Sequence, residues 1–83
     1  MVTGMNIDIE YNGKVYHIQT EDRGINNPII LTRIFSTGEL LTTRKTSYLY
    51  LLDIDGLKNV VESLMKEQHN EMIQEVYSGK VAK

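Results

Sequence analysis

The stretch 55–78 most constrains the fold, because it is the only part of the chain with sustained helical periodicity. At about 100° per residue, the apolar side chains of its first half fall on one stripe: Leu57, Val60, Val61, Leu64 and Met65. Asp55 stands where an N-cap is expected and Gly79 where a helix stops. We therefore expect one helix at about 55–78. The rest of the chain must supply the surface on which its stripe is buried.

The second half of this helix does not continue the same stripe. Its apolar residues point roughly 120° away from the first set, and they are Met72, Ile73, Val76 and Tyr77. Gln68 points into the first stripe with His69 beside it, and a buried amide needs a hydrogen-bond partner. Two alternatives are open. The helix bends near 69–70, or its second half packs against a different surface, either the N-terminal strands or a second chain.

The residues before the helix predict two β-hairpins. Asn12-Gly13 between two alternating runs is a strong hairpin signal, and a second turn with Gly38 occupies 36–39. We expect strands at about 5–12, 14–21, 29–36 and 39–46. A two-residue loop makes the paired residue numbers of the first hairpin sum to 25, which places His17 opposite Asp8. The short apolar stretch 47–54 is compatible with a single turn tucked under the helix.

This order predicts one α+β domain over 1–83, in which a four-stranded antiparallel meander carries the helix on one face. The third strand has apolar residues on both sides, so its buried face is less clear. We expect Ile30 and Ile34 in the core, with Leu31 and Phe35 partly exposed on the opposite face. Apolar surface of that kind indicates a covered back face or a partner.

The composition excludes several classes of protein. The absence of cysteine excludes disulfides and thiolate zinc sites, and it favours a reducing cytoplasm. The net charge of −2 argues against a general binder of nucleic acid or membrane surfaces. No apolar run approaches the ~20 residues of a membrane span, and the first residues lack the features of a signal peptide. We therefore expect a cytoplasmic protein.

The sequence carries no recognisable catalytic pattern. His17 opposite Asp8 would suit an acid/base pair or a weak metal site, but no third group is fixed nearby. His69 has Met72 and Ile73 where a second metal ligand on a helix would stand. Phosphate-binding glycine loops and nucleophile motifs are missing. We expect no enzyme, no cofactor and no metal.

Two segments, HIQTEDRG at 17–24 and LMKEQHNEM at 64–72, resemble a group of short bacterial proteins and domains with no assigned activity. The resemblance covers about 5–78 and supplies no catalytic residues. It implies a bacterial cytoplasmic or accessory protein, with 20–24 and 68–69 as the places of interest.

The favoured functional hypothesis is a small interaction or adaptor module that forms a homodimer or binds another protein. Its expected surface consists of Gln68, His69, Met72, Ile73, Val76, Tyr77, Leu31 and Phe35. The alternative is a nucleic-acid or anion-binding module, with contacts from Arg23, Arg33, Arg44 and Lys45. Acidic residues outnumber basic ones, 11 to 9, and no aromatic platform interleaves the basic residues, so a protein partner is preferred. A small-molecule enzyme is a third hypothesis, since fold does not exclude function.

Overall fold

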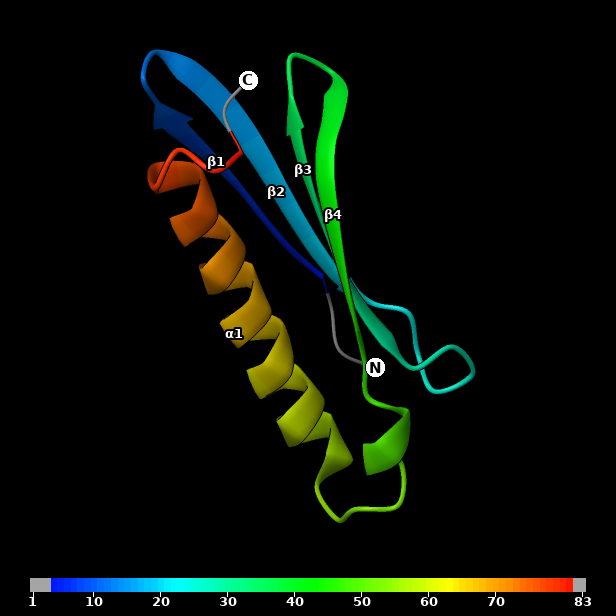
Figure 1. Cartoon of the computed structure of the whole chain (residues 1–83). Helices are drawn as coiled ribbons and strands as arrows, with labels where there is room; N and C mark the ends of the chain where they lie inside the picture. Colours follow the sequence, from blue (N-terminus) through cyan, green and yellow to red (C-terminus); the bar gives the residue numbers. More distant parts are fainter. Residues whose placement is uncertain (1–3, 82–83) are drawn as a thin grey trace.

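The protein folds into a four-stranded antiparallel sheet with one helix packed on one face (Figure 1). The computed structural model describes residues 4–81. The elements in chain order are β1 (Met5–Tyr11), β2 (Lys14–Asp22), β3 (Ile29–Ser36), β4 (Glu39–Ser47), the 3-10 turn η1 (Leu49–Leu51) and α1 (Leu57–Tyr77). The strands lie side by side in chain order. The α+β meander expected from the sequence is confirmed.

Both hairpins close through two-residue turns. Asn12 and Gly13 have φ angles of 54° and 75°, and Thr37 and Gly38 have φ angles of 51° and 78°. Positive φ at both central residues is the type I′ geometry, whose twist matches that of the strands it joins. The paired residue numbers of β1 and β2 sum to 25, as predicted. Turn chemistry and strand pattern therefore determine the register together.

The predicted stop of α1 is confirmed, whereas its predicted N-cap is not. Gly56, in the left-handed conformation, occupies the N-cap position, and no side chain caps the helix. The prediction of Asp55 as N-cap is therefore wrong, because the cap falls one residue later on a residue without a side chain. At the other end the amide of Gly79 donates to the carbonyl of Val76, and that of Lys80 donates to Glu75. This is a Schellman motif, and it confirms Gly79 as the stop.

The core between sheet and helix consists of two apolar clusters. The cluster toward the hairpin turns contains Ile9, Tyr16, Ile18, Ile34, Met72, Val76 and Val81. The cluster beside η1 contains Ile30, Tyr48, Val61 and Met65. Ile30 and Ile34 are fully buried, as predicted. The helix contributes side chains to both clusters and therefore packs along the length of the sheet.

The buried residues of α1 lie on a single face, contrary to the predicted rotation. They are Val61, Met65, Gln68, His69, Met72 and Val76. Successive spacings of 4, 3, 1, 3 and 4 residues are those of one continuous helical stripe. The predicted rotation is wrong because it counted only apolar residues, whereas Gln68 and His69 belong to the buried face. The second half of the helix packs on β1 and β2, which is one of the surfaces considered.

Candidate functional site

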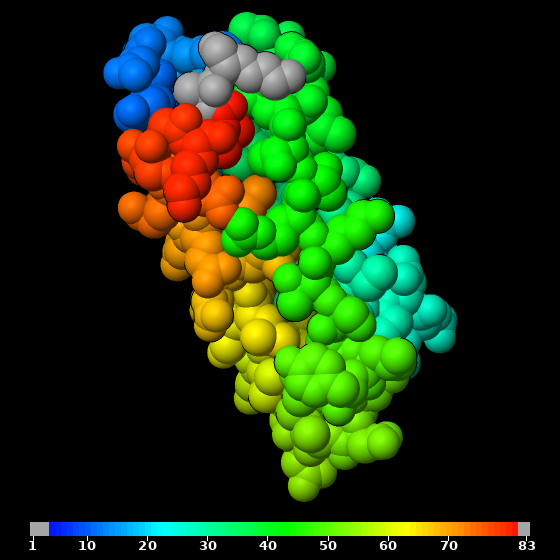
Figure 2. Space-filling view, viewed as in Figure 1, coloured from blue at the N-terminus to red at the C-terminus, as the bar shows by residue number. Residues whose placement is uncertain are grey.

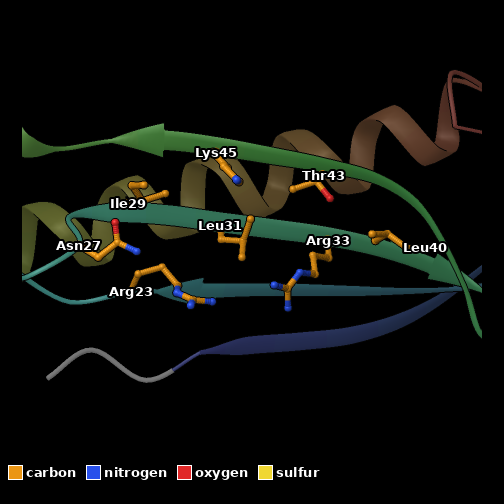
Figure 3. A pocket seen from close by; sticks show the side chains of 8 residues that line it. All are labelled: Arg23, Asn27, Ile29, Leu31, Arg33, Leu40, Thr43 and Lys45. Carbon is orange, nitrogen blue, oxygen red and sulfur yellow. The ribbon is translucent and has the colours of Figure 1, made fainter.

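The candidate site lies on the face of the sheet that α1 does not cover, which we call the open face. Side chains alternate along each strand, so the neighbours of core residues point to this face. They include Asp8 and Glu10 of β1, Val15, His17, Gln19 and Glu21 of β2, Ile29, Leu31, Arg33 and Phe35 of β3, and Leu40, Thr43 and Lys45 of β4. In Figure 3 the helix lies behind the sheet, and no other described element covers this face.

A hollow of about 710 Å³ opens on this face. Figure 3 shows its lining: Arg23, Asn27, Ile29, Leu31, Arg33, Leu40, Thr43 and Lys45. Leu31 is only 5% exposed, so the expectation that it is partly uncovered is wrong. It stands between Glu21 of β2 and Lys45 of β4, with Arg33 next on the same side of its own strand. The aliphatic stems of these long side chains cover Leu31 and leave their charged ends at the surface.

The charges around the hollow are unbalanced. Arg23 donates from Nη1 to Glu21 Oε1 at 2.8 Å, and both side chains are more than 40% exposed. Such a surface pair contributes at most ~1 kcal/mol, so it is easily exchanged. Arg33 and Lys45 form no ion pair with any residue in the range 4–81. Three cationic side chains therefore face one carboxylate, and two of them are available to an anion.

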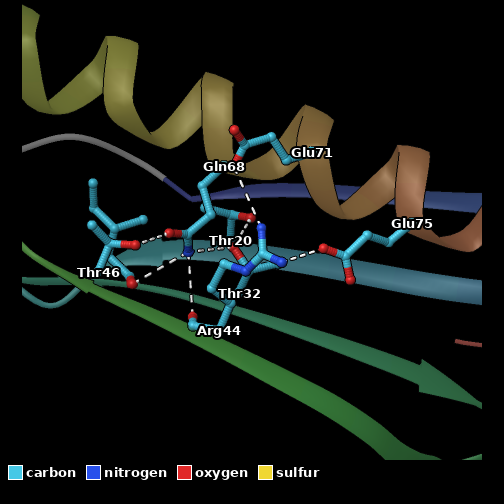
Figure 4. A network of polar contacts seen from close by, with 8 residues as sticks. Thr20, Thr32, Arg44, Thr46, Gln68, Glu71 and Glu75 are labelled. Carbon is cyan, nitrogen blue, oxygen red and sulfur yellow. Dashed lines mark hydrogen bonds and ion pairs between the residues drawn. The ribbon is translucent and has the colours of Figure 1, made fainter. Parts of the chain in front are cut away.

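Arg44 does not join the other three basic residues. It alternates with Thr43 and Lys45 along β4 and therefore points to the helix. There its guanidinium donates to Glu71 Oε1 at 3.4 Å and to Glu75 (Figure 4). The anticipated grouping of four basic residues is wrong for Arg44.

His17 lies on the open face opposite Asp8, as the predicted register requires. Its Nδ1 donates to Asp8, and Gln19 Nε2 donates to its Nε2 at 2.9 Å. The ring is tilted against Phe35, with the two centroids 6.4 Å apart. Both ring nitrogens are engaged, which leaves neither for a general base or a metal ligand. Among residues 4–81 no group of three or more His, Asp or Glu side chains could hold a metal ion.

The interaction surface expected on the helix is mostly internal. Four of its members are at most 4% exposed and pack inside the chain itself: Gln68, His69, Met72 and Val76. That part of the prediction is wrong, since these side chains cannot contact a partner. Ile73 is half-buried against the first apolar cluster. Tyr77 is 45% exposed and meets Tyr11 edge to face, and Phe35 is half-buried on the open face.

Gln68 is the centre of a buried polar layer between the two apolar clusters. Its Nε2 donates to Thr32 Oγ1 at 2.9 Å and to the carbonyls of Ile30 and Arg44 at 3.3 Å each. Its Oε1 accepts from the hydroxyl of Thr46 (Figure 4). The amide is therefore satisfied by β3 and β4, and it joins the helix to both strands.

His69 completes this layer on the side of β2. Thr20 Oγ1 lies 2.8 Å from His69 Nδ1 and 2.7 Å from Thr32 Oγ1. Donation from Gln68 through Thr32 and Thr20 to His69 gives each hydroxyl one donor and one acceptor. Burial lowers the pKa of His69 and favours the neutral ring. No buried side-chain polar atom of the described residues lacks a partner. The layer is closed and satisfied, so we assign it a structural role.

The turn η1 is the single turn considered for 47–54, and it packs under the helix through Leu51 and Leu52, but the sequence indicated no functional role for this end of the molecule. Tyr48 is buried, whereas Leu49 and Tyr50 are 63% and 77% exposed. We call 49–55 the tip segment; it also carries the exposed residues Asp53 and Asp55. A single helical turn can bury only some of its side chains. The three consecutive residues Tyr48, Leu49 and Tyr50 therefore indicated in the sequence that some apolar side chains would face solvent.

Comparison with known proteins gives no relative: the chain matches no family model, no curated protein and no solved structure. The resemblance of 17–24 and 64–72 to short bacterial proteins is not confirmed by these comparisons. Within the described residues, no helix is long and apolar enough to cross a membrane.

Proposed function

We propose that the protein is a non-enzymatic interaction module that binds an acidic segment of a protein through its open face. The observation that carries this proposal is the hollow over Leu31. There Arg33 and Lys45 have no acidic partner within residues 4–81. The same lining contains the exposed side chain of Leu40 and the half-buried side chain of Ile29. Apolar side chains beside cations without an ion pair suit a peptide that presents both apolar and carboxylate side chains.

A protein partner fits the open face better than a nucleic acid does. Asp8, Glu10 and Glu21 lie on the same face and repel a continuous phosphate backbone. Phe35 is the only Phe, Tyr or Trp side chain that the described strands place on this face, and the ring of His17 lies tilted against it. Single-stranded nucleic acids bind by stacking several bases on such rings. The mixed charges and the exposed apolar side chain of Leu40 instead favour a segment of protein.

A peptide titration tests this function. The probe is an extended peptide in which Glu alternates with Val, and its control is the same peptide with Gln in place of Glu. We expect the acidic peptide to shift amide NMR signals of β3 and β4 around Leu31 and Arg33, with an affinity that falls as salt rises. The double variant Arg33→Gln with Lys45→Gln should weaken binding about 10-fold or more. Lys58→Gln, on the exposed surface of α1, is the matched control and should bind like the wild type.

Three results would contradict the proposal. Equal binding of the Glu and Gln peptides would show that the free cations play no part. Signals that shift on α1 instead of the sheet would place the binding surface elsewhere. A single-stranded oligonucleotide that binds more tightly than the peptide, through the same two cations, would replace the protein partner with a nucleic acid.

A further inference from the structure

The tip segment combines exposed apolar and acidic side chains. Leu49 and Tyr50 stand largely in solvent, and Asp53 and Asp55 form no ion pair within the described residues. No cationic residue occurs between Lys45 and Lys58. Figure 2 shows the green-to-yellow part of the chain forming one end of the molecule. Tyr is among the residue types enriched at binding hot spots, and the exposed side chain of Leu49 beside Tyr50 adds apolar surface.

The hollow begins at this same end of the molecule. Its lining includes Asn27 and Ile29, which lead into β3. The amide of Tyr48 donates to the carbonyl of Pro28 at 2.8 Å, so the tip segment leaves the sheet beside the hollow. The Tyr48 hydroxyl also donates to Asp22 at 2.6 Å. These two bonds hold Tyr48, which directly precedes the tip segment, against the sheet, and no residue of the tip segment lines the hollow of its own chain.

Tip segment and hollow have complementary character. The tip segment presents two carboxylates and no cation. The hollow is lined by three cations and by the apolar side chains of Ile29 and Leu40, and of the cations only Arg23 is paired, with Glu21. Each molecule therefore carries both halves of one contact. Two copies related by a two-fold axis can exchange these halves, so that the contact is made twice in a closed dimer.

We infer that a second copy of this chain occupies the hollow, with the tip segment of each copy lying in the hollow of the other. This inference rests on the proposed function, since it names the acidic segment that the open face binds. The tip segment spans only residues 49–55, so we expect a weak dimer whose population depends on concentration and salt.

A charge exchange tests the contact. The tip variant carries Asp53→Lys and Asp55→Lys, and the hollow variant carries Arg33→Glu and Lys45→Glu. Sedimentation velocity over a range of concentrations should show a monomer–dimer equilibrium for the wild type. Each variant alone places like charges together, which should raise the dissociation constant roughly 100-fold. An equimolar mixture should restore dimers, because in the mixed dimer both contacts again join opposite charges.

Recovery of dimers in the mixture would show that each variant lost the contact and not its fold. Circular dichroism of each variant reports its fold, and Tyr50→Ser, at an exposed side chain, gives an independent variant that should also weaken the dimer. A wild type that stays monomeric at millimolar concentration, or a mixture that does not restore dimers, would overturn the inference.

The peptide titration distinguishes failure of the dimer inference from failure of the proposed function. It is repeated on the tip variant, whose hollow is intact and unoccupied by a second copy. Binding of the acidic peptide there, together with a monomeric wild type, leaves the proposed function in place and removes only the second copy as occupant. A tip variant that does not bind the peptide removes the proposed function itself.

Discussion

At the scale of single residues, the buried histidine makes stability depend on pH. Burial lowers the pKa of His69 below its ordinary value of 6.5. As the pH falls through 6.5, the unfolded chain takes up a proton that the folded chain does not. The free energy of unfolding therefore falls, until the pH drops below the folded pKa. We expect denaturant unfolding between pH 7.5 and 5.5 to show this loss, and His69→Asn, which keeps an acceptor for Thr20, to reduce it.

His17→Asn is the matched control for this experiment. His17 is bonded on the exposed side of the sheet, so its replacement leaves the His69 contribution to the slope in place. If His69→Asn retained the full slope of the wild type, the burial of His69 would not be its cause.

Tyr48 makes the free energy of unfolding fall in the opposite direction of pH, as the pH rises above 10. Burial, the hydrogen bond to Asp22 and the charge of Asp22 raise its pKa to about 12. Between pH 10 and 12 the unfolded chain loses the phenolic proton while the folded chain keeps it. Stability therefore falls as pH rises, by at most ~1.4 kcal/mol per pH unit. Tyr48→Phe should flatten this slope and cost ~1 kcal/mol at neutral pH through the lost hydrogen bond. Tyr50→Phe, at an exposed ring, should keep the slope; identical slopes in both variants would refute the assignment.

At the scale of elements, the second hairpin turn is the less favourable of the two. Thr37 adopts a φ of 51°, a left-handed conformation that a β-branched residue rarely takes, whereas the first turn has Asn12 at the equivalent position. We expect Thr37→Asn to stabilise the fold by about 1 kcal/mol in thermal or urea unfolding. The reverse change, Asn12→Thr, should destabilise by a similar amount. A destabilising Thr37→Asn would mean that the bond from the Thr37 hydroxyl to the Ser36 carbonyl outweighs the backbone preference.

The elements themselves could be predicted because their signals are local. Asn12-Gly13 sets a turn type, the turn sets the register, and the register places His17 opposite Asp8. The burial of Gln68 and His69 could not be derived in the same way. Their partners Thr32 and Thr20 lie 36 and 49 residues away, and no local pattern shows that four polar groups will meet. The burial of Leu31 could not be predicted for a related reason, since the side chains next to it belong to the adjacent strands.

At the scale of the whole molecule, the polar layer restricts where the helix can sit. The helix carries apolar residues before and after the layer, so a slide by one turn, about 5.4 Å, would still bury methionine and valine. The same slide would separate Gln68 from Thr32 and leave hydroxyls against apolar side chains, at ~1–3 kcal/mol for each unpaired group. Only one axial position of the helix on the sheet satisfies every group. Because the tip segment connects β4 to α1, this single position also fixes how far the tip projects beyond the sheet.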